Sequence, residues 1–227
     1  MATIRNIRIY RSTIENIDGN SHPEGFYNQE LSCVVFRICM KLREKEFSMG
    51  DFHHLYINFT TCKDAGTISL AARSIDKYQP WYRYYDIGIS QETYDSLLTK
   101  ECIPTVIELL EKTLKTQFDT HEFGEALISE CISEAVTQGA DMLMKYKEKI
   151  TPKGKAVLYM RYLDNFRFFP LLRVYDAEDK VILEKDLPET TTFDNFGQIS
   201  LTSKKVTIKP RKNSREDFYE PIVFELL

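Results

Sequence analysis

The sequence has no run of about 18 apolar residues, the length that a helix needs to cross a bilayer. Its first residues, MATIRNIRIYRST, also lack the apolar core of a secretory signal peptide. The five cysteines are an odd number without short spacings, which does not suit a disulfide framework. We therefore expect a cytoplasmic protein with free thiols and no contact with a membrane.

Motifs that carry catalysis or hold a cofactor are missing as well. The chain has no GxGxxG or P-loop sequence and no CxxC pair of zinc ligands. Carboxylates are abundant, but no pair stands out as an acid and a base. His53 and His54 are adjacent, and neighbours on a strand point to opposite faces, so we expect them not to bind one metal ion together. The sequence thus predicts a non-catalytic protein without cofactor or metal.

Aromatic residues are plentiful, with thirteen Tyr and fourteen Phe beside a single Trp. A chain of 227 residues is long enough to bury a core without disulfides or metals. The pI near 5.7 argues against nucleic-acid binding across the whole surface.

Alternating apolar and polar residues predict strands in both terminal parts of the chain. The clearest alternation lies between Leu31 and Arg43, where the even positions are apolar, and it predicts an antiparallel strand with one wet face. The predicted strands are 3–10, 31–43, 55–60, 68–72, 78–89, 156–163, 171–175, 181–184, 198–201, 206–208 and 222–226.

The segment from Ser90 to Lys149 has helical periodicity instead, and it predicts helices of about 9, 15 and 29 residues. Ser90 is a good N-cap, and Thr151-Pro152 ends the last helix. Strands in about 3–89, helices in about 90–149 and strands in about 155–227 predict one α+β domain over 1–227. We expect the helices to pack on one face of a mostly antiparallel sheet or pair of sheets.

The predicted helices are acidic. Eleven acidic residues oppose three basic ones between Asp86 and Glu134. Such a surface attracts a basic partner, and Glu122, Glu125 and Glu130 are candidates to contact it. A solvated helix face without a partner is the alternative.

A second candidate is the aromatic stretch from Tyr78 to Tyr85. Trp, Tyr and Arg dominate the binding energy of protein interfaces, which makes this stretch a candidate contact with a protein partner. Aromatic pairs inside a sheet are the alternative. The candidate partner-binding residues are Trp81, Tyr82, Arg83 and Tyr84.

A basic cluster follows near the end of the chain. Residues 203–215 contain six Lys or Arg and no acidic residue. A lysine-rich edge strand that resists aggregation explains this cluster without a ligand.

The segment 84–98, YYDIGISQETYDSLL, is a predicted strand that runs into a capped acidic helix. Here the chain is similar to the immunity proteins of bacterial polymorphic-toxin systems. The resemblance implies a protein that binds its cognate toxin and neutralises it by occlusion. We therefore expect a protein-binding inhibitor whose partner is a basic toxin domain. Two alternatives stay open: a structural or scaffold component of a larger assembly, and an enzyme whose site forms only in three dimensions.

Overall fold

The computed structural model describes residues 2–14, 26, 28–71, 78–118, 123–212 and 220–226. These residues form helices and largely antiparallel sheets, which confirms the α+β class. We expected one domain over 1–227, and the chain folds into two compact units, Met1–Gly139 and Ala140–Leu227. The N-terminal and C-terminal strands form separate sheets.

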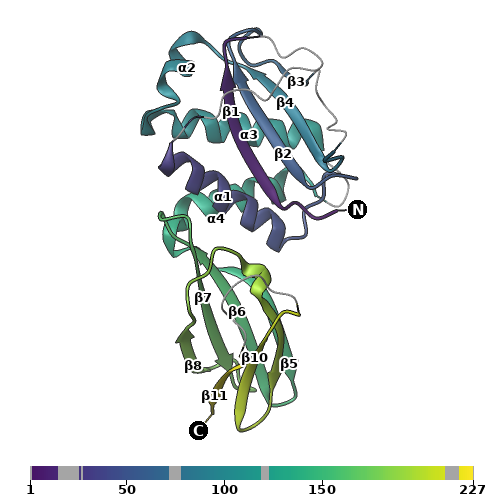
Figure 1. Ribbon diagram of the computed structural model, residues 1–227, viewed down its shortest axis with the longest axis vertical. Coiled ribbons are helices and arrows are strands. Elements are labelled where there is room, and N and C mark those ends of the chain that lie inside the picture. Colours follow the sequence, from purple (N-terminus) through teal and green to yellow (C-terminus); the bar gives the residue numbers. More distant parts are fainter. Residues whose placement is uncertain are drawn as a thin grey trace. The chain divides into compact units, whose positions relative to one another are not determined.

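The first unit is built on a four-stranded sheet with the strand order β1-β2-β4-β3 (Figure 1). Strands β1 (Asn6–Ser12), β2 (His54–Thr60) and β4 (Tyr82–Gly88) run parallel, whereas β3 (Ile68–Leu70) pairs antiparallel with β4. A parallel pair needs a crossover connection, and α1 (Gln29–Glu44) supplies it between β1 and β2. Three of the four strands of this sheet therefore pair in parallel, whereas we expected mostly antiparallel pairing.

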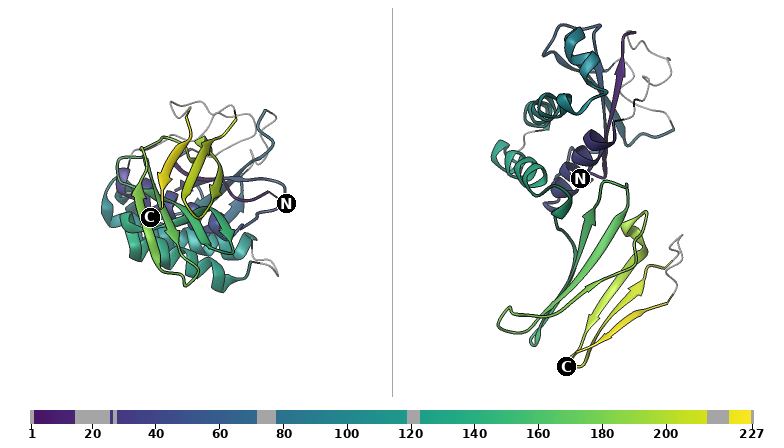
Figure 2. Two further views of the ribbon diagram at one scale, coloured as in Figure 1. Left: turned by 90° about the horizontal axis from the view of Figure 1, so that it is seen from below. Right: turned by 90° about the vertical axis from the view of Figure 1, so that its left-hand side faces the viewer.

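Three more helices follow β4, and the helices cover one face of the sheet (Figure 2, right). They are α2 (Gln91–Ser96), α3 (Ile103–Phe118) and α4 (Glu125–Gln138). The N-cap at Ser90 is confirmed, because its side chain accepts a hydrogen bond from the Thr93 amide at 3.1 Å. Short 3₁₀ turns lie at Lys100–Cys102, Gly139–Asp141 and Phe193–Asn195.

The last helix is about half as long as predicted. It ends before Gly139, whose φ of 54° is a conformation that glycine adopts at little cost. The predicted continuation to Lys149 is wrong, because residues from Met144 onward form a strand. Lys145, Lys147 and Lys149 occupy alternate positions of that strand.

The strand predicted over 31–43 is also wrong, because this segment lies inside α1. Val35, Ile38 and Leu42 follow helical spacing and are almost completely buried. The helix packs against both β1 and α4, so apolar side chains occur around most of its circumference. Val34 and Phe36 are apolar although they are only half-buried, and with Ile38, Met40 and Leu42 they imitate the alternation of a strand.

The second unit contains two antiparallel sheets that pack as two layers (Figure 2, right). Their orders are β5-β6-β7-β8 and β9-β10-β11. Lys147 of the four-stranded sheet donates hydrogen bonds to the carbonyls of Phe196 and Gly197 in the three-stranded sheet, at 2.7 and 2.9 Å. The strands are β5 (Met144–Thr151), β6 (Gly154–Tyr162), β7 (Phe168–Tyr175), β8 (Val181–Asp186), β9 (Phe196–Leu201), β10 (Lys205–Pro210) and β11 (Ile222–Glu225).

Strand β10 carries part of the basic cluster and lies between β9 and β11. The explanation of this cluster as an edge strand is therefore wrong. Lys205 of this cluster lies opposite Glu225 of β11 in the register of the sheet. One basic residue of the cluster thus faces an acidic residue on a neighbouring strand.

Candidate partner-binding surface

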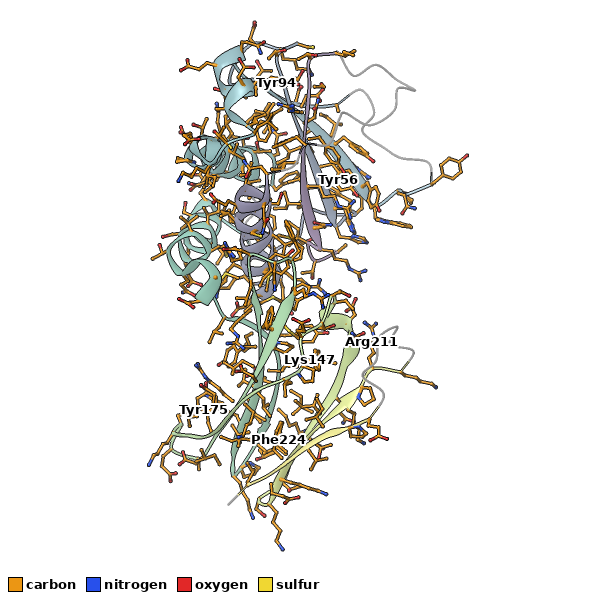
Figure 3. All side chains as sticks on the ribbon, turned by 60° about the vertical axis from the view of Figure 1, so that its left-hand side comes forward. Tyr56, Tyr94, Lys147, Tyr175, Arg211 and Phe224 are labelled. Atoms are coloured by element: carbon orange, nitrogen blue, oxygen red, sulfur yellow. The ribbon has the colours of Figure 1, made fainter. Side chains whose placement is uncertain are left out.

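The sheet of the first unit has a helix-covered face and an aromatic face. In its register Tyr56 of β2 pairs with Tyr84 of β4, and both rings lie on the side away from the helices. Figure 3 shows the Tyr56 side chain on that side of the strands. On the other side Tyr85 packs edge-on against Phe118 of α3, with 5.5 Å between the ring centroids. The pleat thus divides the predicted aromatic strand between the core and the opposite face.

Four tyrosines form a cluster on the aromatic face. The ring centroid of Tyr56 lies 4.7 Å from that of Tyr82, 5.0 Å from that of Tyr84 and 5.6 Å from that of Tyr10. Tyr56 and Tyr84 are only 3% exposed, whereas Tyr10 and Tyr82 are half-buried at its margin. Burial, with a hydrogen bond to Tyr82, raises the pKa of the Tyr56 phenol. The cluster is thus a rigid apolar support, and the candidate Tyr84 lies inside it.

Trp81 lies at the edge of this cluster, at the N-terminal end of β4. Its side chain is 38% exposed and stacks on the His53 ring with 6.1 Å between centroids. The amides of His53 and His54 both donate to the Trp81 carbonyl at 3.2 Å. The His54 ring in turn lies 4.8 Å from the Tyr82 ring. The backbone bonds and the ring contacts together hold an exposed indole in one place.

His53 and His54 converge, although we expected them to point to opposite faces. Their Nδ1 atoms lie 2.5 Å apart. The expectation is wrong because His53 precedes the first residue of β2, so the alternation of the strand does not extend to it. Burial, followed by the charges of Arg5 and Arg43, lowers the pKa of His53. Burial, then His53, Arg8 and Arg5, lowers the pKa of His54 to about 4.

Two exposed arginines of the N-terminal strand region complete this surface. The Arg5 amide donates to the His53 carbonyl at 2.8 Å, and Arg8 places its guanidinium 5.6 Å from the centre of the Tyr56 ring. Neither guanidinium forms an ion pair with a carboxylate in the described part of the chain. We call these residues the Trp81 surface: Arg5, Arg8, His53, His54, Trp81 and Tyr82.

The candidate Arg83 belongs to the helix-covered side. Its guanidinium lies 5.0 Å from the centre of the Phe52 ring and pairs with Asp51 at 3.0 Å. It also donates to the carbonyls of Pro80 and Tyr82. Arg83 therefore holds the segment in front of β4 in place, and its charge is already matched.

The acidic candidates are divided. Glu122 lies outside the described residues, and Glu125 is exposed in the first turn of α4. Glu130 pairs with Lys45 at 3.4 Å, and its neighbour Glu134 pairs with Lys41 at 2.9 Å. Two lysines at the end of α1 thus offset two of the acidic charges of α4.

A polar cluster occupies the other end of the aromatic face. Asn58 donates to Asp86 at 2.9 Å and to Ser12 at 3.2 Å. Lys63 pairs with the buried Asp86 at 3.3 Å and donates to Ser69 at 2.6 Å. Open parallel sheets bind ligands at these carboxyl ends of strands, but here the charged groups bond to one another. The cluster links β1, β2 and β4 to β3 and the segment that precedes it.

Comparison of the chain with protein-family models, with curated proteins and with solved structures gives no match. Within the described ranges, no three His, Cys, Asp or Glu side chains gather to hold a metal ion. None of the helices described here is long and apolar enough to cross a bilayer. Trp81 and Tyr82 were predicted from the sequence as residues of the Trp81 surface. His53, His54, Arg5 and Arg8 were not.

Proposed function

We propose that the chain is a non-catalytic protein-binding inhibitor that neutralises a cognate toxin by occluding it, with the Trp81 surface as its contact. The observation that carries the proposal is the exposed indole of Trp81, stacked on His53 and fixed through its own carbonyl. An anchor that is already ordered loses little conformational entropy when a partner binds it. Trp is also the residue type most enriched among interface hot spots.

The buried tyrosines support the same proposal. Tyr56 and Tyr84 are buried beneath the Trp81 surface, so the exposed rings pack against close-packed side chains. The acidic helices add Glu125 as an exposed charge for a basic toxin domain. Part of the remaining acidic excess is matched within the unit, so the aromatic contact is the main support of the proposal.

The test begins with the genes next to this one: a neighbouring gene that encodes a basic toxin domain is co-expressed with it in a host. Growth of the host reports neutralisation, and surface plasmon resonance with the purified toxin reports the dissociation rate. Trp81→Ala should cost about 2 kcal/mol of binding free energy and speed dissociation about 30-fold. Phe166→Ala is the matched control, because Phe166 and Trp81 have the same exposed fraction of 38%. Full protection and unchanged dissociation with Trp81→Ala would refute the proposal.

A second candidate function, a scaffold component of a larger assembly, is favoured by β8. This strand pairs with β7 alone among the described strands, and both Val181 and Ile182 on it are exposed. An open edge with apolar side chains accepts an added strand from another chain. A concentration-dependent sedimentation coefficient of the purified protein, lost on Ile182→Lys, would favour this candidate over the first.

A further inference from the structure

We propose that the Trp81 surface binds an acidic segment of its protein partner, and that Arg5 and Arg8 are the carboxylate-binding residues. This inference rests on the proposed function and names the chemistry of the partner at that site. It differs from the expectation of a purely basic partner, which was derived from the acidic helices alone.

The positive charge of the surface is the first support. Arg5 and Arg8 are exposed, and neither has a carboxylate partner among the described residues. Asp51, the acidic residue nearest to His53 in sequence, is held by Arg83. Within the described ranges, two guanidiniums beside an exposed aromatic anchor thus have no carboxylate as a counter-charge.

The chemistry of the guanidinium is the second support. Its planar fork donates two parallel hydrogen bonds to one carboxylate, which gives geometric specificity as well as energy. The Arg8 side chain lies over the Tyr56 ring, so its direction is fixed before a ligand arrives. Burial and neighbouring positive charges lower the pKa of both imidazoles beside the arginines. In the neutral pair one ring donates its Nδ1–H to the other, so only the accepting ring keeps an N–H, at Nε2, for a ligand.

An acidic protein segment fits this surface better than a nucleic acid. Single-stranded nucleic acids are held by aromatic rings whose faces are free to stack on successive bases. Tyr56 and Tyr84 are buried, so their rings are closed to bases. The net charge of −4 on the whole chain also repels a phosphate polymer beyond the local patch.

The single tryptophan makes a direct test possible, since Trp81 is the only indole in the chain. The probes are decaglutamate, decalysine and a thymidine decanucleotide, titrated into the full-length protein while Trp81 fluorescence and heat of binding are recorded. Decaglutamate should give a saturable change in both signals, with an affinity that falls as salt is added. Decalysine should leave the Trp81 fluorescence unchanged.

The variant Arg5→Glu/Arg8→Glu should weaken decaglutamate binding at least tenfold. Its matched control is Lys204→Glu/Lys209→Glu, which changes the net charge equally on exposed residues of the second unit. Arg5→Gln/Arg8→Gln should also weaken binding, and it replaces the reversed variant if that one has a lowered melting temperature. Binding of the decanucleotide alone, no saturable binding of decaglutamate, or equal weakening by the control variant would each overturn the inference.

The proposed function and this inference fail in different ways. If Trp81→Ala abolishes toxin neutralisation while Arg5→Gln/Arg8→Gln protects the host fully, the inhibitor function is supported. The proposal that the surface binds an acidic segment is then refuted. If the arginine variant loses decaglutamate while Trp81→Ala still neutralises the toxin, the acidic-ligand site stands and the inhibitor function through Trp81 falls.

Discussion

The Nδ1 atoms of His53 and His54 lie 2.5 Å apart, so the Nδ1–H of one imidazole can donate a hydrogen bond to the Nδ1 of the other. A ring nitrogen that accepts a hydrogen bond must be unprotonated, so the pair cannot be doubly protonated without moving apart. Burial, followed by the charges of His53, Arg8 and Arg5, lowers the pKa of His54, and the Tyr56 and Tyr82 rings lie next to it. The folded state therefore favours the neutral form of His54.

This relationship predicts that stability falls in mild acid. The pKa of His54 is lowered from 6.5 in the unfolded chain to about 4 in the folded one. Between these values the unfolded state binds more protons, so the free energy of unfolding rises with pH across this window and levels off above it. The partial exposure of the ring reduces the effect to about 1 kcal/mol.

Thermal melts from about pH 4 to about pH 7.5 measure this effect. His54→Gln keeps a hydrogen-bonding side chain and removes the titrating group. The difference between the original protein and His54→Gln should therefore shrink toward the acid end of the window. Two melting curves that stay parallel over the whole range would contradict the assignment.

A second prediction compares two lysines at the end of α1. Lys41 is 7% exposed and pairs with Glu134 at 2.9 Å and with Glu44 at 3.0 Å. Lys45 is exposed and pairs with Glu130, which is exposed as well. Lys41→Ala should lower the free energy of unfolding by about 2–3 kcal/mol, because it leaves carboxylates without their partner. Lys45→Ala should cost less than about 0.5 kcal/mol. Urea unfolding of both variants measures the contrast, and equal midpoints would contradict the packing of α1 against α4.

The same helix shows where prediction from the sequence stops. Strands β6 to β11 of the second unit and the start of α2 were predictable, because local alternation and an N-cap specify them, whereas β5 was predicted as helix. Helix α1 was not, since it packs against both β1 and α4 and its burial conceals the helical period. The signal that was available is Asn28, whose side chain accepts a hydrogen bond from the Leu31 amide at 3.1 Å.

The candidate surface was predictable in part for a related reason. The composition of the stretch around Trp81 indicated an interface, because residue type alone carries that information. The convergence of His53 on His54 and the nearness of Arg5 depend on parallel pairing of strands far apart in the sequence. The charge count from the sequence could not include Lys41 and Lys45 as partners of α4, because these lysines approach Glu134 and Glu130 only after folding.

The thiols give a third prediction. All five cysteines are free, and burial raises the pKa of Cys39 to about 12 and that of Cys131 to about 11. The thiolate is the reactive form, so Cys62, the exposed cysteine, should react first with a disulfide reagent in the native protein. Five thiols should react in denaturant without reductant. Cys62→Ser should abolish the fast phase, and a fast phase that persists in this variant would show that a buried cysteine is accessible.

The last prediction concerns the rate at which a basic toxin domain is captured. Glu125 is exposed and Glu130 is about half exposed, so reversing both to Lys should slow association and leave dissociation nearly unchanged. Glu178→Lys/Glu220→Lys reverses two exposed acidic residues of the second unit and is the matched control. Association measured at two salt concentrations decides the matter, because screening weakens steering between exposed charges. If the association rate is independent of salt and equal in all three proteins, the acidic face of α4 is a solvated helix surface. Trp81 would then have to carry recognition without electrostatic help from α4.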